Sequence, residues 1–218
     1  MIKGLLFDLD GVIVDTAKYH FLAWKSLCDQ LGYKFDLADN ELLKGVSRIR
    51  SFNIILELNN QKMSEEEVEK YCTLKNEIYL KYINNLTEDE ILPGVREFLD
   101  KAKRKHYGIA LGSASKNSRL ILDKLNLTDM FDVIIDGTKV ANAKPDPEVF
   151  IKGAEELGLS NEECVVFEDS VAGIVAAHNG NMKAIGVTNP EVTEYCDYYI
   201  KSFLNLDIDI LMRKVEGE

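Results

Sequence analysis

No segment of this 218-residue chain is dense in lysine and arginine, and 26 basic residues stand against 37 acidic ones. The formal net charge of −11 disfavours polyanions as partners. We therefore expect no nucleic-acid partner and no membrane partner. An anionic small molecule would need a local cluster of positive groups that acts against the overall field.

Cysteine is scarce, without any C-x-x-C pair, and the few thiols lie far apart at Cys28, Cys72, Cys164 and Cys196. This spacing fits neither a disulfide framework nor a zinc site, and it is typical of free thiols in a reducing compartment. The chain also lacks an apolar run of the roughly 18 residues that a membrane-spanning helix requires. Charged Lys3 and Asp8 come too early for a signal peptide. We expect a cytoplasmic protein.

Short apolar runs recur along the chain, at residues 2–7, 108–112, 131–135, 164–167 and 183–187. They are apolar at consecutive positions, as strands buried on both faces of a parallel sheet are. Helical patterns separate these runs from the second one onward. The alternation predicts an α/β fold with a mostly parallel sheet.

Residues 16–91 interrupt this alternation, because they show helical spacing and no convincing strand. Glycine and polar segments divide them into several helices. We therefore predict two domains: an α/β core made of residues 1–15 and 92–218, and an all-helical domain of residues 16–91 inserted after the first strand.

Polar side chains follow the apolar runs, at the strand ends where ligands bind in open α/β sheets. Four of them are carboxylates, two are hydroxyls and one is a lysine in a loop: Asp8, Asp10, Glu168, Asp169, Ser113, Ser115 and Lys144. Carboxylate oxygens suit a hard cation of the magnesium type. The set therefore predicts a Mg²⁺ site at one edge of the sheet.

Each of these residues also has a simpler interpretation. The pentad FDLDG could be a turn or another type of metal motif, and Ser113 could cap a following helix. Lys144 could be a solvated loop lysine, and Glu168 with Asp169 could cap the next helix. Their joint occurrence, in order, at successive strand ends favours the functional interpretation.

Four segments resemble the motifs of the haloacid dehalogenase superfamily: FDLDGVIVDT at 7–16, GSAS at 112–115, KPDPEVF at 144–150 and FEDSVAGIVAA at 167–177. The resemblance covers nearly the whole chain and weakens after about Thr188. It implies a Rossmann-like, doubly wound core with an inserted helical cap. It also implies a Mg²⁺-dependent enzyme.

The same resemblance assigns roles to the residues at the strand ends. Asp8 would attack a phosphoryl group and become phosphorylated, and Asp10 would act as general acid and base. The Mg²⁺ ligands would be Asp8, Glu168 and Asp169, with Asp10 contributing its backbone carbonyl. Ser113 and Lys144 would contact the transferring phosphoryl group.

The helical segment resembles the cap of the β-phosphoglucomutases, a family within this superfamily. That resemblance implies substrate contacts from both predicted domains: Thr16, His20, Trp24, Gly45, Val46, Arg48, Lys75, Ser115, Lys116 and Asn117. Local patterns also allow Trp24 to be a core residue and His20 a partly buried hydrogen-bonding group. Gly45 could simply end one helix, and Ser47 could cap the next.

The function implied is an isomerase of carbohydrate metabolism that interconverts β-glucose 1-phosphate and glucose 6-phosphate through β-glucose 1,6-bisphosphate. The alternative is a Mg²⁺-dependent sugar-phosphate phosphatase on the same scaffold. Both take a small sugar phosphate as substrate, and we expect a monomer.

Overall fold

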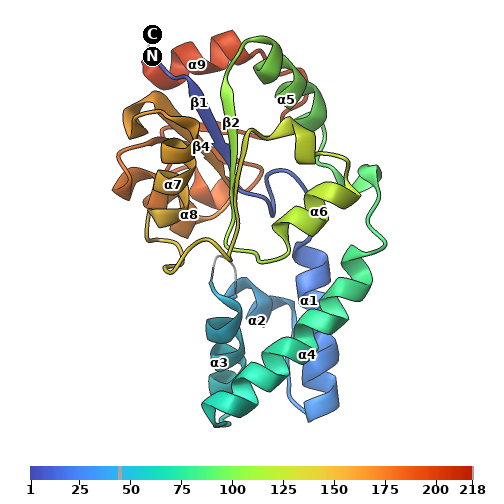
Figure 1. Cartoon of the computed structure of the whole chain (residues 1–218). Helices are drawn as coiled ribbons and strands as arrows, with labels where there is room; N and C mark the ends of the chain where they lie inside the picture. The colour runs from blue at the N-terminus through green and yellow to red at the C-terminus, as the bar shows by residue number, and fades with distance from the viewer. Residues whose placement is uncertain (44–45, 218) are drawn as a thin grey trace. The chain divides into compact units, whose positions relative to one another are not determined.

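The computed structural model describes residues 1–43 and 46–217 (Figure 1). Contacts between Cα atoms divide the chain into two compact units. The core unit comprises Met1–Asp15 and Thr87–Glu218, and the helical unit comprises Thr16–Leu86. That the segments predicted from the sequence, 1–15 with 92–218 and 16–91, act as separate domains stays a prediction.

The core unit is built around a six-stranded sheet with the strand order β3-β2-β1-β4-β5-β6. All five pairings between neighbouring strands are parallel. The α/β class and the parallel sheet are thus confirmed. The strands are β1 (Gly4–Phe7), β2 (Gly108–Gly112), β3 (Val133–Ile135), β4 (Cys164–Glu168), β5 (Lys183–Val187) and β6 (Tyr198–Ile200).

The strand order reverses direction at β1, which pairs with β2 on one side and with β4 on the other. Phe7, the last residue of β1, is in register with Leu111 of β2 and Phe167 of β4. The residues that follow in each strand therefore emerge together at the carboxyl edge. This is the switch point at which open α/β sheets bind ligands.

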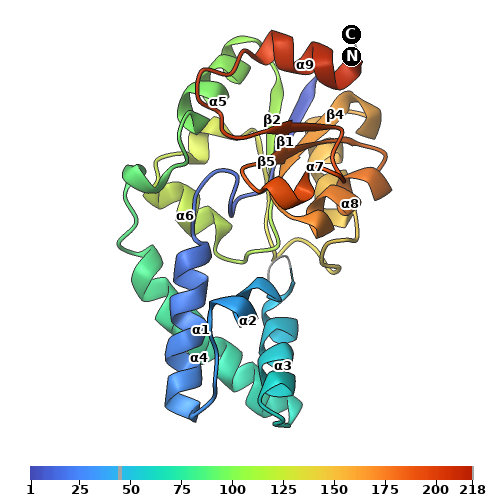
Figure 2. The same cartoon turned by 180° about the vertical axis from the view of Figure 1, so that it is seen from behind.

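Helices cover both faces of the sheet (Figures 1 and 2). One face packs on α7 (Glu148–Leu157) and α8 (Val171–Asn179) through an apolar cluster that includes Leu6 and Val166.

The other face carries α5 (Val95–Arg104), which also contacts α9 (Ile208–Glu216). Here the rings of Phe7 and Phe167 stack with centroids 4.6 Å apart, and Phe98 of α5 lies edge-on against both. The two strands next to the switch point are thus held from both faces by apolar packing.

Shorter elements complete the core unit. They are α6 (Ser118–Lys124) and four 3₁₀ turns: η1 (Glu88–Glu90), η2 (Thr128–Met130), η3 (Asn161–Glu163) and η4 (Pro190–Val192). The N-terminus lies beside α9, where the terminal amino group is 3.4 Å from a carboxylate oxygen of Glu216 (Figure 1).

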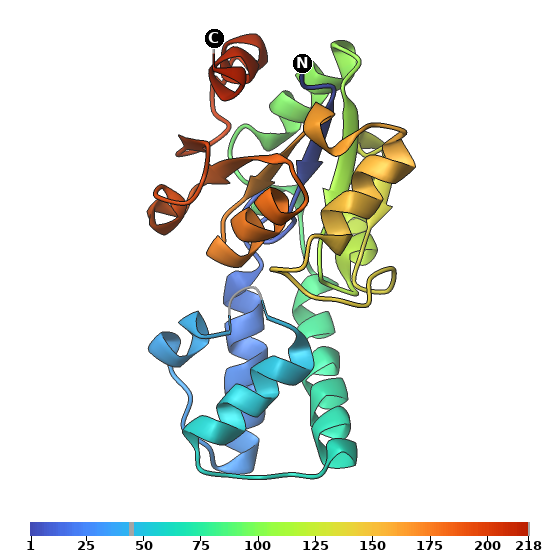
Figure 3. The ribbon, with the colours of Figure 1, turned by 90° about the vertical axis from the view of Figure 1, so that its left-hand side faces the viewer.

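The helical unit contains α1 (Ala17–Leu31), α2 (Leu37–Glu41), α3 (Arg48–Leu58) and α4 (Glu65–Ile83), and no strand occurs among its described residues. Helices α1 and α4 lie side by side (Figure 3).

Ser47 caps α3 through a hydrogen bond from the Arg50 N–H, as the simpler interpretation of this segment held, and Ser64 caps α4. The unit has its own apolar core, which includes Trp24, Leu27 and Phe52. None of the helices in the described part of the chain has the length and apolar character needed to cross a bilayer.

Candidate active site

Three carboxylates meet at the carboxyl edge of the sheet. Asp8 follows β1, whereas Glu168 ends the adjacent β4 and Asp169 comes next. Each offers an oxygen, and these oxygens all lie within 4.8 Å of one another. Two ligands of one Mg²⁺ are at most about 4.2 Å apart, twice the Mg–O distance, so a small side-chain rotation closes the gap. The oxygen-only donor set fits Mg²⁺.

Lys144 lies between two of these carboxylates. Its ammonium donates to Oδ1 of Asp8 at 2.6 Å and to Oε2 of Glu168 at 2.7 Å. The side chain is buried, and the ammonium also sits 4.7 Å from the ring centre of Phe150 on α7. The Lys144–Pro145 peptide bond is cis. Lys144 is therefore a component of the carboxylate cluster, and the solvated-loop interpretation is wrong.

Burial and mutual repulsion set the protonation of the cluster. Burial raises the pKa of Asp8 to about 6, with Lys144 opposing the shift and Glu168 adding to it. Burial, followed by the charges of Glu168 and Asp8, raises the pKa of Asp169 to about 9. Burial alone would lower the pKa of Lys144, but the two carboxylates outweigh it and raise that pKa. Such shifts are typical of functional sites.

Asp10 is not one of the three clustered carboxylates, although its charge adds to the raised pKa of Asp169, and its predicted role through a backbone carbonyl stays a prediction. It lies in a tight turn in which the Gly11 N–H donates to the Val14 carbonyl at 2.9 Å. Gly11 adopts a φ of +79°, and a Cβ there would overlap the Asp169 carboxylate. Only glycine allows the turn and Asp169 to approach so closely.

Ser113 follows β2 in a loop that orients two hydroxyl groups. Its N–H donates to the Ile135 carbonyl at 3.0 Å, and its Oγ accepts the Ser115 N–H at 3.2 Å. The Ser115 Oγ in turn accepts the Asn117 N–H at 3.2 Å, and Lys116 between them is exposed. Because each oxygen accepts a backbone N–H, each hydroxyl proton can point to a ligand. The cap of α6 is Asn117, so Ser113 is not a helix cap.

Two glycines that the sequence did not single out shape this edge. A Cβ on Gly137 would overlap the Ala114 carbonyl, and the Gly137 N–H donates to the Ser115 carbonyl at 3.2 Å. A Cβ on Gly173 in the first turn of α8 would overlap the Glu168 carboxylate. Gly173 lies within the segment FEDSVAGIVAA that resembles a family motif, whereas the only sequence signal of Gly137 is a position shortly after an apolar run.

Ser170 also contributes to the site, although the sequence did not indicate a role for it. Its N–H and its Oγ both donate to Oε1 of Glu168, at 3.0 and 2.8 Å. It is also the N-cap of α8, because its Oγ accepts the Gly173 N–H. The alternative in which Glu168 and Asp169 cap this helix is therefore wrong.

A second polar cluster lies within the helical unit. Nζ of Lys75, on α4, is 2.8 Å from Nδ1 of His20 on α1. The same ammonium lies 4.8 Å from the ring centres of both Trp24 and Tyr79, and the Tyr79 ring stacks on His20 at 4.2 Å. A protonated lysine can only donate, so His20 accepts at Nδ1 and carries its proton on Nε2. The cluster combines a buried cation with a neutral imidazole.

The remaining predicted residues of this unit lie around the cluster or near α3. Burial, with the charges of Lys75 and Arg48, lowers the pKa of His20 well below its usual value. Arg48 is the first residue of α3, and burial lowers its pKa also. Thr16 is buried at the start of α1, and Val46 is half-buried just before the Ser47 cap.

The predictions for Trp24 and Gly45 complete the account of this unit. Trp24 stacks on Phe52 with ring centres 5.8 Å apart and belongs to the apolar core, as its simpler interpretation held. Its predicted contact with substrate stays a prediction. Gly45 lies outside the described residues.

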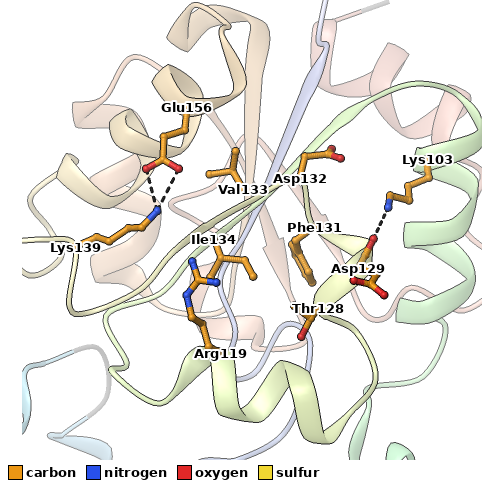
Figure 4. Close-up of a pocket in the computed structure, with 10 residues that line it drawn as sticks. All are labelled: Lys103, Arg119, Thr128, Asp129, Phe131, Asp132, Val133, Ile134, Lys139 and Glu156. Carbon is orange, nitrogen blue, oxygen red and sulfur yellow. Dashed lines mark hydrogen bonds and ion pairs between the residues drawn. The ribbon is translucent and has the colours of Figure 1, made fainter.

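A cavity of about 420 Å³ lies beside β3 in the core unit (Figure 4). None of the predicted site residues lines it. Lys139 donates to Glu156 at 3.0 Å, Lys103 donates to the Asp129 carbonyl, and Arg119 lies 3.5 Å from Asp136. Because these cations are already paired, the cavity is a weaker candidate for an anionic ligand than the carboxylate cluster.

Comparison with known proteins places this arrangement in a family. The family model described as haloacid dehalogenase-like hydrolase matches residues 5–187. β-Phosphoglucomutase of Bacillus subtilis is 38% identical over 98% of this chain and 96% of its own length. Fructose-1-phosphate phosphatase YqaB of Escherichia coli is 31% identical over 84% of this chain and 95% of its own length.

A solved structure agrees with the sequence comparisons. The crystal structure of β-phosphoglucomutase from Clostridium difficile is 39% identical to this chain, with a TM-score of 0.94 and coverage of 100% of this chain and 98% of that one. The matched residues 5–187 include all of the clustered carboxylates and Lys144. The chain therefore belongs to the haloacid dehalogenase-like hydrolases.

Proposed function

We propose that this chain is a Mg²⁺-dependent phosphomutase that interconverts β-glucose 1-phosphate and glucose 6-phosphate. The observation that carries the phosphoryl-transfer chemistry is the buried Lys144, paired with both Asp8 and Glu168 beside Asp169. The similarity to β-phosphoglucomutases over nearly the full chain supports the choice of substrate. Asp8, Glu168 and Asp169 would hold Mg²⁺, which supplies positive charge that offsets repulsion between a carboxylate and a phosphate.

The core residues have properties that suit transfer of a phosphoryl group. With a pKa of about 6, Asp8 is mainly ionised at neutral pH and can act as the nucleophile. Lys144 adds a fixed positive charge where the phosphoryl charge develops. Ser113 can donate its hydroxyl proton to a phosphoryl oxygen, because its Oγ already accepts the Ser115 N–H.

The reaction proceeds in two transfers. In the first, an oxygen of Asp8 forms a bond to phosphorus while the ester P–O bond of β-glucose 1,6-bisphosphate breaks, and Asp10 protonates the released sugar oxygen. In the second, Asp10 takes the proton from the hydroxyl of the incoming sugar monophosphate, and that oxygen displaces Asp8. The bisphosphate is thereby regenerated.

We assign the contacts with the second, distal phosphate to Arg48, Ser115 and Asn117, and Lys116 stays a further predicted substrate contact. Arg48 offers a bidentate fork, and it lies in the first turn of α3, where backbone N–H groups and the helix dipole favour an anion.

In the helical unit, Lys75 and Trp24 would contact the sugar, together with the Gly45–Val46 segment. Thr16 and His20 would help to bring Asp10 into place. A phosphatase that acts on a monophosphate does not need contacts with a distal phosphate.

The second candidate is a sugar-phosphate phosphatase, in which water replaces the sugar hydroxyl as acceptor. The similarity to the Escherichia coli fructose-1-phosphate phosphatase favours it. One assay separates the two functions: β-glucose 1-phosphate with Mg²⁺ and a trace of β-glucose 1,6-bisphosphate, in which both products are followed. Glucose 6-phosphate should form much faster than inorganic phosphate. Faster release of inorganic phosphate would establish the phosphatase instead.

Two variants test the assigned roles. Asp8→Asn should abolish both activities, because the amide is not a nucleophile. Arg48→Ala should lower mutase activity by at least about 100-fold, since a charge-assisted phosphate contact is lost, and should leave hydrolysis of acetyl phosphate intact. Arg50→Ala is the matched control, because Arg50 is two residues further along α3 and pairs with Glu57 at 2.7 Å. Equal loss of both activities in Arg48→Ala would contradict its role.

A further inference from the structure

The residue after β5 has a strained backbone. Thr188 adopts a φ of +58°, in the left-handed region that β-branched residues rarely occupy. Its side chain is exposed, so burial does not explain why a threonine stands here. Strain of this kind persists only when neighbouring contacts hold it, and it concentrates at functional sites.

The contacts of Thr188 show what holds it. Its N–H donates to the Ile200 carbonyl of β6 at 3.1 Å, and its own carbonyl accepts the Tyr199 hydroxyl at 3.0 Å. Its Oγ1 is thereby directed to the carbonyl of Gly11, to which it donates at 3.0 Å. The edge strand β6 thus anchors a hydroxyl against the turn that carries Asp10.

This hydrogen bond completes the fixing of the turn. The Gly11 N–H already donates to Val14, and a trans peptide is planar, so the Asp10 carbonyl must point in the opposite direction. Thr188 fixes the following peptide unit through the Gly11 carbonyl. Both peptide units that flank Gly11 are therefore held, and with them the direction of the Asp10 carbonyl.

Asn189, the next residue, makes a corresponding contact with the backbone of Asp169. Its Nδ2 donates to the Asp169 carbonyl at 2.9 Å, and the Asp169 N–H donates to Oε1 of Glu168 at 3.0 Å. The orientation of the Asn189 amide is determined, because its Oδ1 accepts the Glu191 N–H at 3.1 Å. Both backbone groups of Asp169 are thus held.

We propose that Thr188 and Asn189 are positioning residues that fix the Asp10–Gly11 turn and the Asp169 backbone for Mg²⁺ binding. The inference rests on the proposed Mg²⁺ site but not on the choice between mutase and phosphatase. Groups that orient metal ligands typically contribute 10- to 100-fold to metal affinity. The competing interpretation is purely structural, with Asn189 as the cap of η4 and Thr188 as part of a loop.

The test is calorimetric titration of the full-length protein with Mg²⁺ alone, together with thermal unfolding in EDTA. Thr188→Val and Asn189→Ala should each weaken Mg²⁺ binding by about tenfold or more, whereas Thr188→Ser, which keeps the hydroxyl, should bind within about twofold of the wild type. Thr193→Val is the matched control, because the exposed Thr193 hydroxyl also donates to a backbone carbonyl, that of Pro190 at 2.7 Å. It should bind Mg²⁺ normally.

Thr188→Gly separates positioning from folding. Glycine accepts a positive φ without strain, so this variant should unfold at the same or a higher temperature and still bind Mg²⁺ about tenfold more weakly. Normal Mg²⁺ affinity in folded Thr188→Gly and Asn189→Ala would overturn the inference and leave the proposed function standing. Failure of the wild type to bind Mg²⁺ would overturn both. A wild type that binds Mg²⁺ but releases inorganic phosphate would contradict only the mutase assignment.

Discussion

Replacing Asp169 by asparagine should stabilise the metal-free protein while it removes Mg²⁺ binding. In the folded state the pKa of Asp169 is about 9, against 3.8 for the free side chain. Between these values the folded protein binds a proton that the unfolded chain lacks, so the free energy of unfolding falls as the pH rises. Asparagine does not titrate and escapes this penalty.

The size of the effect follows from the same numbers. Each pH unit within the window changes the free energy of unfolding by about 1.4 kcal/mol. Asp169 begins to lower the free energy of unfolding near pH 3.8, the pKa of its free side chain. This loss reaches at most about 4 kcal/mol at pH 7 and is below about 2 kcal/mol at pH 5. The gain in Asp169→Asn should therefore grow with pH.

Urea denaturation in EDTA at pH 5, 7 and 8 measures this gain, with Asp197→Asn as the matched control. Burial by itself would raise the pKa of Asp197, but hydrogen bonds from the Ala184 N–H, His178 and Lys183 outweigh it and lower that pKa. Its stabilisation is present above the usual Asp pKa and is lost as the pH falls through the lowered value. Asp197→Asn should therefore destabilise the protein at pH 7.

The two substitutions of aspartate by asparagine should thus have opposite signs. Added Mg²⁺ should raise the free energy of unfolding of the wild type and leave that of Asp169→Asn unchanged. If Asp169→Asn is no more stable than the wild type in EDTA at pH 8, or if its gain does not increase with pH, the electrostatic account of the cluster is wrong.

Three further outcomes are expected. Mg²⁺ affinity should rise between pH 6 and pH 9, because Asp169 must lose its proton to bind the ion. Calorimetric titrations in two buffers of different ionisation enthalpy should show this proton release, and Mg²⁺ binding that is independent of pH would contradict the prediction. Gly173→Ala should weaken Mg²⁺ binding in calorimetry at least tenfold, because the added Cβ would displace the Glu168 carboxylate. Unchanged Mg²⁺ affinity would show that Gly173 and the Glu168 carboxylate are not in close contact. Lys144→Met should lower the free energy of unfolding, measured by urea denaturation at pH 8, by about 3 kcal/mol or more, since Asp8 and Glu168 lose their shared cation. A smaller loss of stability at pH 8 than at pH 5 would refute this reasoning.

The apolar runs predicted most of the sheet because burial on both faces leaves a local pattern of consecutive apolar residues. The runs at 108–112 and 183–187 coincide with β2 and β5. β6, Tyr198–Ile200, was missed, since its first two residues are only half-buried tyrosines and the strand lies between the charged Asp197 and Lys201.

By itself the sequence determined which polar residues follow which strands, because strand ends and the residues after them are local features. The tertiary structure decided which of these residues meet. Lys144 reaches Asp8 across 136 residues of chain, and Thr188 reaches Gly11 across 177. Such contacts depend on the strand order and register, which place β1 beside β4 and bring β5 to the same edge. No local pattern encodes that arrangement, since it results from packing of the whole sheet between its two layers of helices.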